Sequence, residues 1–283
     1  MLAPFNDNSN AAKRTQHLHP TQQQYVDIHC HCLPGIDDGP ATIADALALC
    51  CRLVDDCITE VIATPHQLGR FTDCNEAAHI RQAVSLLNEE LRIHNIPLTV
   101  MPGGDVRVDE RICKLLEADK ILTLADGGKY LLLELPQEVF IDIEPLLVEL
   151  VSSGIQPIIS HPERHPVLAK QPKILLKWLE RSAHLQVTSA SLLGDFGLPA
   201  QTAAWHLLST GWASFVATDS HDTVVRRPCM NTAFERISIE LGPATAQLVC
   251  IENPSRVLQG KDIASAPFAN TRKCINDRIS SSF

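Results

Sequence analysis

Short apolar runs alternate with longer amphipathic stretches along most of the chain. Each apolar run covers five or six residues, a length typical of buried parallel strands. Seven such runs predict strands, at residues 25–29, 59–64, 97–101, 130–135, 156–160, 184–188 and 213–218. The stretches that follow them carry apolar residues at helical spacing and predict helices at residues 42–55, 76–93, 110–116, 144–151, 173–180, 199–208 and 229–239. Thr42 is the expected N-cap of the first helix.

This order of elements predicts an α/β fold. Strand and helix alternate seven times, which implies right-handed crossovers and a closed or nearly closed parallel sheet. An open doubly wound sheet is the competing topology, and its ligands gather at one switch point from two or three strands. Five strands of this chain end in candidate ligand residues, which favours the closed barrel.

The two ends of the chain lack this pattern. Residues 1–24 are rich in Gln, Asn, Thr and His without a hydrophobic period, and we expect a disordered N-terminal arm there. Residues 266–283 are rich in Ser and Asn and are expected to form a flexible tail. The remaining residues, 25–265, suffice for one large barrel domain.

Composition narrows the class of protein. The 283 residues include 24 Lys plus Arg and 33 Asp plus Glu, a net charge of −9, so a general nucleic-acid binder is excluded while a local basic pocket is not. Residues 1–24 hold no apolar signal-peptide core, and no apolar run reaches the roughly 18 residues of a membrane span. Ten cysteines without a Cys-x-x-Cys pair are therefore expected to be reduced thiols in a cytoplasmic protein.

Residues of metal-ligand type stand directly behind five of the predicted strands. They are His29, His31, His66, Glu134, His161, Asp219 and His221. A single histidine after a strand is most often structural, but five such coincidences are a pattern. Ligands at the carboxyl ends of parallel strands converge on one face of a barrel, and imidazole with carboxylate suits zinc, manganese or iron.

The local spacing of these residues supports chelation. His29 and His31 share one face of a strand because side chains alternate with period two, and Cys30 then faces the packing layer. Asp219 and His221 repeat that spacing with a mixed pair. Glu134 ends a strongly apolar strand, where a carboxylate needs either a metal or a salt-bridge partner.

Two loops offer further carboxylates. Asp37 and Asp38 lie in a Gly/Pro-rich turn behind the His-x-His strand, where they form either a turn or helix cap, or one of them reaches a metal. Asp105 follows another strand, after two glycines that permit close backbone approach.

A set of five histidines and three or four carboxylates would hold two or three divalent cations, which suits phosphoryl transfer. Arg164 and the Arg226–Arg227 pair would bind phosphate oxygens, with surface salt bridging as the alternative for each. The Cys-x5-Arg spacing of Cys250 and Arg256 is rejected as a thiol phosphatase loop, because Pro254 lacks an N–H and Glu252 repels an anion. There is no Gly-x-Ser-x-Gly elbow and no Walker-type loop.

Seven motifs together resemble the capsule/exopolysaccharide-type bacterial tyrosine-protein phosphatases of the PHP (polymerase and histidinol phosphatase) superfamily. They are Asp-Ile-His-Cys-His at 27–31, Leu-Pro-Gly-Ile-Asp-Asp-Gly at 33–39, Ala-Thr-Pro-His at 63–66, Ile-Leu-Thr-Leu at 121–124, Ile-Ser-His-Pro-Glu-Arg at 159–164, Ser-Leu-Leu-Gly at 191–194 and Ala-Thr-Asp-Ser-His at 217–221. The resemblance covers about residues 25–260 and implies a distorted seven-stranded parallel β/α barrel (TIM-like, PHP) with a trinuclear, manganese-type site.

The resemblance also implies residue roles. The metal ligands would be His29, His31, Asp38, His66, Asp105, Glu134, His161, Asp219 and His221. Glu134 would bridge ions, and Arg164 and Arg227 would contact phosphate, although the double arginine leaves Arg226 open. The sequence departs from the family at Asp105, where Glu is usual, and after His66, where only Arg70 is basic.

The implied activity is hydrolysis of phosphotyrosine by metal-activated hydroxide, with Mn²⁺ favoured over Fe, Zn, Co or Mg. The implied substrate is a bacterial tyrosine kinase of polysaccharide export; neither nucleic acid nor membrane insertion is expected. Two alternatives stay open, a PHP phosphoesterase for a small phosphomonoester such as histidinol phosphate, and a non-catalytic phosphotyrosine-binding regulator.

Overall fold

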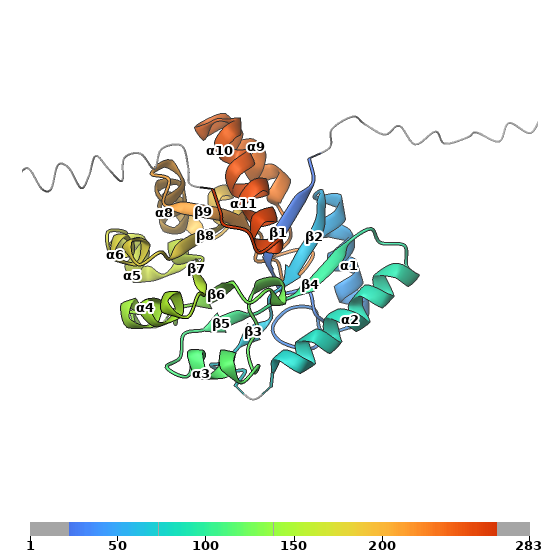
Figure 1. The fold of residues 1–283 in the computed structure, drawn as a ribbon. Helices are drawn as coiled ribbons and strands as arrows, with labels where there is room; N and C mark the ends of the chain where they lie inside the picture. The colour runs from blue at the N-terminus through green and yellow to red at the C-terminus, as the bar shows by residue number, and fades with distance from the viewer. Residues whose placement is uncertain (1–22, 73, 138, 265–283) are drawn as a thin grey trace, which may run out of the picture.

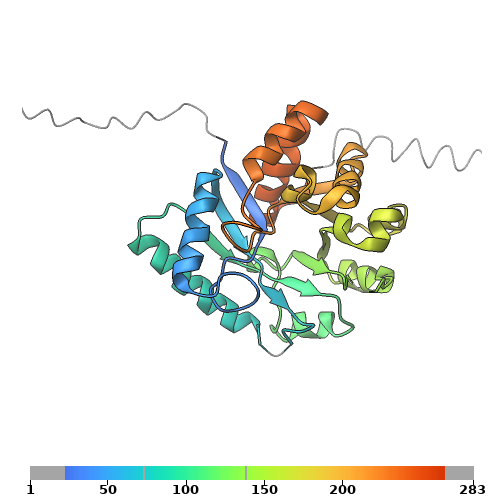
Figure 2. The ribbon, with the colours of Figure 1, turned by 180° about the vertical axis from the view of Figure 1, so that it is seen from behind.

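The structure, a computed structural model, describes residues 23–264 except 73 and 138 (Figure 1). Only the last two positions of the arm predicted at residues 1–24 are described, and the tail predicted at residues 266–283 lies outside the described residues. Figures 1 and 2 show the strands in the middle of the molecule, with most helices around them.

All strand pairs are parallel and fall into two sheets. The smaller sheet has the order β1 (Tyr25–Cys30), β2 (Ile58–Ala63) and β4 (Thr99–Pro102). The larger sheet has the order β3 (His66–Gln67), β5 (Asp105–Arg107), β6 (Tyr130–Glu134), β7 (Gln156–Ser160), β8 (His184–Thr188) and β9 (Ala213–Ala217). The protein thus has a mixed α/β fold with parallel sheets.

The seven predicted strands are all present. The described residues form two sheets, however, and not a single sheet of seven uninterrupted strands. β3 and β5 are additional short strands that follow β2 and β4 after two residues each. Pro65 separates β2 from β3 and has no N–H for a sheet hydrogen bond. Between β4 and β5, a Cβ atom on Gly104 would lie 2.2 Å from Gln67 Oε1, so only glycine allows this close approach.

The outer strands β1 and β9 also approach each other. Cys30 forms an isolated parallel bridge with Ser220, just beyond β9. The Asp219 amide donates to the His29 carbonyl oxygen at 2.7 Å, and the His31 amide donates to the Ser220 carbonyl oxygen at 2.9 Å. These contacts bring the end of the last strand against the end of the first.

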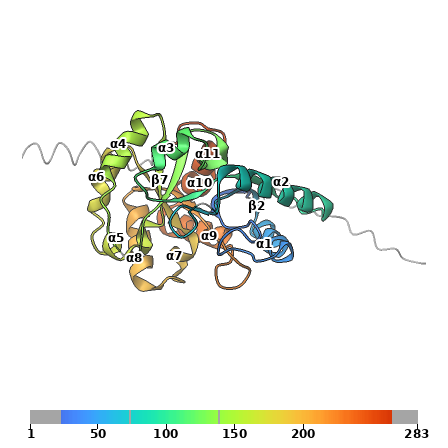
Figure 3. The same cartoon turned by 90° about the horizontal axis from the view of Figure 1, so that it is seen from below.

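The seven predicted helices are confirmed, with bounds that shift by a few residues at most. They are α1 (Ile43–Asp55), α2 (Ala77–Ile93), α3 (Ile112–Glu117), α4 (Glu144–Ser152), α6 (Ile174–Glu180), α8 (Gly197–Ser209) and α9 (Met230–Leu241). Shorter helices were not predicted: α5 (Pro166–Lys170), α7 (Ser189–Leu193), α10 (Pro243–Gln247) and α11 (Asn253–Leu258). Figure 3 shows α1 and α2 on one side of the molecule and α4 to α6 on the other. Thr42 caps α1 as expected, because its hydroxyl accepts from the Asp45 amide at 3.2 Å.

Strand alternation divides the apolar side chains between two clusters. On β6, Leu131 and Leu133 belong to the main core, which lies between strands and helices. Leu132 belongs to a smaller cluster with Ile28 and Ile158 from other strands. Glu134 lies two residues after Leu132, so its side chain is on the same face of β6 as this smaller cluster. Glu134 is also the last residue of β6, so it lies at the carboxyl end of the strand.

Two further observations concern the helices and the cysteines. No helix in the described chain combines the length and the apolarity that a membrane span needs. Among the described residues, no cysteine takes part in a disulfide bond.

Candidate metal centre

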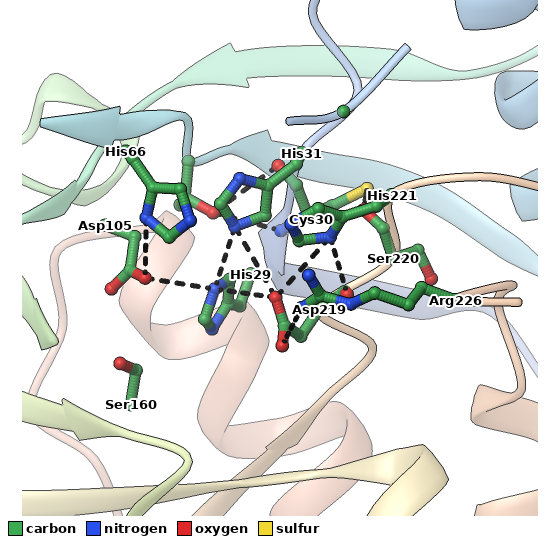
Figure 4. Close-up of polar contacts among 12 residues, drawn as sticks. His29, Cys30, His31, His66, Asp105, Ser160, Asp219, Ser220, His221 and Arg226 are labelled. Carbon is green, nitrogen blue, oxygen red and sulfur yellow. Dashed lines mark hydrogen bonds and ion pairs between the residues drawn. The ribbon is translucent and has the colours of Figure 1, made fainter. Parts of the chain in front are cut away.

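The nine residues predicted as ligands come together at the carboxyl ends of the strands, and Figure 4 shows six of them. Within each of four groups, one potential ligand atom per residue lies within 4.8 Å of the others. The groups are His31–Asp38–His66–His221, His29–Asp105–His161, His29–His31–Asp219 and His66–Asp105–Glu134. Because four residues belong to two groups each, the cluster is continuous.

β1 delivers two histidines with fixed orientation. The Nε2 atoms of His29 and His31 lie 3.3 Å apart, which confirms that the two rings share one face. Each Nδ1 has another partner: Gln186 Oε1 at 2.9 Å for His29 and Asp37 Oδ2 at 2.7 Å for His31. Partners of this kind fix the tautomer and ring orientation of metal-bound histidines.

Burial keeps these rings neutral. Both histidines are fully buried, and desolvation lowers the pKa of His29 to about 4 and that of His31 well below its usual value. Burial likewise lowers the pKa of His161. A neutral imidazole is the form that binds metal.

Asp219 joins the cluster through an unusual backbone. Its φ of 52° is rare for a residue other than glycine, and His161 also has a positive φ, of 31°. Strained residues of this kind cluster at functional sites. Asp219 Oδ1 lies 3.2 Å from His29 Nε2 and 3.5 Å from His31 Nε2 without a hydrogen bond, while Oδ2 accepts from Arg164 and Arg226. Burial opposes its ionisation, but electrostatic interactions with His29, Arg226 and Arg164 hold its pKa well below the usual range.

Asp105 gives the clearest sign that a cation belongs here. It is fully buried, and neither carboxylate oxygen has a hydrogen-bond partner. Oδ2 lies 3.6 Å from His29 Nε2 and 3.5 Å from His66 Nδ1. Burial, followed by the charges of Glu134 and Asp219, raises its pKa well above the usual value. An unpartnered buried carboxylate is costly, and a divalent cation offsets that cost, so the donor set fits the implied metals.

The two neighbouring aspartates of the turn have different places. Asp38 Oδ1 lies 3.3 Å from His221 Nε2 and 3.5 Å from His66 Nε2. Burial tends to raise the pKa of Asp38, but the His221 hydrogen bond and charge outweigh it, so the pKa is lowered. Asp37 instead accepts from His31 Nδ1 and from the His66 amide at 3.0 Å. Asp38 therefore belongs to the ligand cluster, and Asp37 orients it.

A pocket of about 370 Å³ opens above the cluster, and four arginines line it. Each pairs with a carboxylate of the cluster: Arg70 with Asp38 at 2.7 Å, Arg107 with Glu134 at 2.9 Å, and Arg164 and Arg226 with Asp219. Guanidinium groups in this arrangement suit a phosphoryl ligand, because they bind its oxygens in bidentate fashion.

The structure separates the two neighbouring arginines between which the sequence left the choice open. Arg226 lines the pocket, whereas Arg227 is exposed, lies outside the lining and acts electrostatically on Asp56 and Cys229. The reason is the turn after His221, in which Asp222 accepts from the amides of residues 224, 225 and 226. This turn directs Arg226, and not its neighbour, to Asp219.

Three contributors were not predicted: Arg107, Gln186 and Phe71. Arg107 is a charged residue in a three-residue strand, and Gln186 is a polar position within β8, so neither stands out in the sequence. Phe71 follows the His66 motif and lines the pocket. Strand pairing was the available signal for Gln186. In the parallel register of β7 and β8, Gln186 pairs with Ser160, which directly precedes His161.

The rejected thiol loop lies elsewhere. Cys250 is fully buried in a π-helical turn (Leu248–Glu252), and burial raises its pKa, which disfavours the reactive thiolate. His165 lies near the cluster in sequence but caps α5, because its Nδ1 accepts from the Val167 amide at 3.2 Å.

The fold and site define a class of α/β protein with a cluster of potential metal ligands beneath an arginine-lined pocket. Residues 25–259 match the family model described as "Capsular polysaccharide synthesis, CpsB/CapC", and the chain belongs to this family.

Characterised relatives and a solved structure agree. The chain is 33% identical over 243 residues to tyrosine-protein phosphatase YwqE of Bacillus subtilis, covering 86% of this chain and 94% of that protein. It is 25% identical over 240 residues to tyrosine-protein phosphatase CpsB of Streptococcus agalactiae, covering 83% and 98%. A chain from the crystal structures of YwqE from B. subtilis and CpsB from Streptococcus pneumoniae, described as unique metal-dependent tyrosine phosphatases, superimposes with a TM-score of 0.81 at 33% identity, covering 86% and 97%.

Proposed function

We propose that this protein is a metal-dependent protein-tyrosine phosphatase that acts in capsular or exopolysaccharide synthesis. The observation that carries the proposal is the convergence of nine histidine and carboxylate side chains beneath four arginines in one pocket. Membership of the CpsB/CapC family and the tyrosine phosphatases among its relatives support the activity and the capsule link.

We assign the metal ligands within this proposal. They are His29, His31, Asp38, His66, Asp105, Glu134, His161, Asp219 and His221. The set would hold two or three divalent ions. Mn²⁺ is the favoured species by resemblance to the family, and the nitrogen and oxygen donors are compatible with it. Glu134 would bridge ions, since its two oxygens approach different histidines, His66 at 3.6 Å and His161 at 4.0 Å.

The geometry suggests different roles for the cations and for the side chains around them. Divalent cations supply Lewis acidity and lower the pKa of bound water. Arg164 and Arg226, held by the buried Asp219, would bind the phosphoryl oxygens and stabilise the charge that develops on them. We favour Arg226 over Arg227 for this role because Arg226 lines the pocket. Gln186 and Asp37 keep the His29 and His31 rings aimed inward.

The proposal extends to substrate and setting. The substrate would be phosphotyrosine on a bacterial tyrosine kinase of polysaccharide export, and the enzyme would work in the cytoplasm. We further propose that the two sheets form one distorted barrel of seven positions, in which β2 with β3 and β4 with β5 are interrupted strands. Residues 25–265 would form this domain, flanked by an N-terminal arm and a C-terminal tail.

Parallel assays of two substrates test the function. Mn²⁺-loaded protein should release phosphate from a phosphotyrosine peptide much faster than from histidinol phosphate. A preference for histidinol phosphate would assign the site to small phosphomonoesters. Tight binding of the peptide without turnover, at full metal content, would make the protein a phosphotyrosine-binding regulator.

A further inference from the structure

The segment after His66 forms a constrained turn at the rim of the pocket. Leu68 and Gly69 both have positive φ, of 68° and 59°. The Phe71 amide donates to the Leu68 carbonyl oxygen at 3.1 Å, and the Thr72 hydroxyl donates to the Gly69 carbonyl oxygen at 2.7 Å. Leucine in a left-handed conformation is strained and persists only where its surroundings hold it. The position of Phe71 is therefore determined by the fold.

The Phe71 ring is tied to the metal cluster. It stacks on His66, with ring centroids 5.6 Å apart and planes inclined by 13°. The Arg70 guanidinium lies 4.8 Å from its centroid and also pairs with Asp38. Among the described residues that line the pocket, Phe71 has the one phenyl ring. A hydrocarbon ring thus stands beside groups suited to a phosphoryl ligand.

We propose that Phe71 is a specificity-determining residue that recognises the aromatic ring of a phosphotyrosyl substrate; this inference rests on the proposed function. Arg164 and Arg226 are anchored to Asp219, which is almost fully buried, whereas Phe71 is only partly buried. A phosphoryl group at the arginines lies deep, so the group that connects it to a polypeptide crosses the rim. A tyrosyl ring fills that length and meets Phe71 in an aromatic contact, which a seryl methylene does not provide.

The surroundings of Phe71 leave room for such a substrate. Phe71 and Leu68 also line an adjoining pocket of about 220 Å³. The ring therefore stands between two cavities, and a polypeptide has space beyond the phosphotyrosyl side chain.

Binding of two phosphonates to Mn²⁺-loaded, full-length protein tests this inference. Phenylphosphonate and cyclohexylphosphonate present the same anion on rings of similar size, one aromatic and one not. Calorimetry gives both dissociation constants without any turnover. The variants are Phe71→Leu, Phe71→Tyr as a conservative rescue, and Phe140→Leu as a matched control. Phe140 is also a partly buried phenylalanine, stacked on Trp178 at 6.1 Å but outside the pocket lining.

We expect Phe71→Leu to reduce the preference for phenylphosphonate over cyclohexylphosphonate by about three- to tenfold, the size of one aromatic pair. Phe71→Tyr and Phe140→Leu should keep the wild-type preference, and metal content should stay unchanged. An unchanged preference in Phe71→Leu, or equal weakening of both ligands, would overturn the inference. If phosphotyrosine hydrolysis persists in that case, only the role of Phe71 is wrong; if wild-type protein neither binds phosphonate nor hydrolyses phosphotyrosine, the proposed function fails with it.

Discussion

The two faces at the end of β1 are equally buried and chemically opposite. His29, Cys30, His31 and Cys32 are all fully buried. The two histidines face carboxylates, among which Asp105 and Asp219 keep oxygen atoms without hydrogen bonds. The two cysteines belong to the main apolar core, together with Cys50 of α1, and burial raises the pKa of the Cys30 thiol. Burial alone therefore does not mark function, whereas buried polar atoms that lack partners do.

The first prediction compares one variant on the histidine face with one on the cysteine face. His31→Ala removes a shared ligand and should lower both bound metal and kcat/KM for a phosphotyrosine peptide. The loss should exceed the roughly 100-fold that altering a mere supporting partner of a ligand produces. Cys32→Ala, one position away on the other face, should keep its metal. Metal analysis and kinetics on both variants test this prediction. If both variants kept metal and activity, or if both lost them, the proposed difference between the two faces of the strand would be wrong.

The second prediction separates phosphate binding from metal binding. Arg164→Ala should keep its metal and lose on the order of 10²–10³ in turnover, by comparison with other preorganised donors. Arg256→Ala, in the rejected Cys250 loop, is the control and should turn over like wild type. Wild-type turnover in Arg164→Ala would make this arginine a structural ion-pair residue only.

The third prediction concerns the support of the histidine face. Gln186 Oε1 lies 2.9 Å from His29 Nδ1. Gln186→Leu keeps the apolar bulk but removes this acceptor, and it should weaken metal affinity by about 10- to 100-fold. Gln186→Glu keeps an acceptor and should retain affinity. Competition with a metal-binding dye measures both, and equal affinities in wild type and Gln186→Leu would exclude an orienting role.

The fourth and smallest effect lies in the helical layer. Asp56, at the C-terminus of α1, accepts from the Met230 and Asn231 amides. Burial raises the pKa of Asp56 from its ordinary value of 3.8 to about 6, although the two hydrogen bonds oppose this. The folded state therefore holds the proton more tightly, so this contribution to stability is complete below about pH 3.8 and is lost as pH rises through about 6.

Urea unfolding of metal-free wild type and Asp56→Asn across this pH range measures that effect. The free energy of unfolding of wild type minus that of the variant should fall from pH 4 to 6 and then level. A difference that rises with pH would reverse the assigned sign.

The sequence predicted most of the fold because strand and helix periods are strong over long segments. It missed β3 and β5, since strands of two or three residues carry no period and depend on Pro65 and Gly104 between longer strands. The family resemblance predicted nine candidate ligands, and the structure brings these nine residues together in one cluster. The resemblance could not separate Arg226 from Arg227, because that choice depends on the side-chain hydrogen bonds of Asp222 within a turn.

Arg107 was missed for a related reason. Its role depends on a contact across strands, in which Nη1 donates to Glu134 Oε2 at 2.9 Å. The sequence around Arg107 gives no indication that it contacts Glu134, 27 positions later. Local patterns therefore predict which residues end a strand, and the three-dimensional register decides which of them meet.

The central claim is that catalysis depends on cations held by the histidine and carboxylate cluster. Exhaustive chelation, with metal content followed by mass spectrometry, tests it together with phosphotyrosine peptide hydrolysis. Activity should disappear as metal is removed and return best with Mn²⁺ or a similar ion. Full activity in protein shown to be free of metal would contradict it.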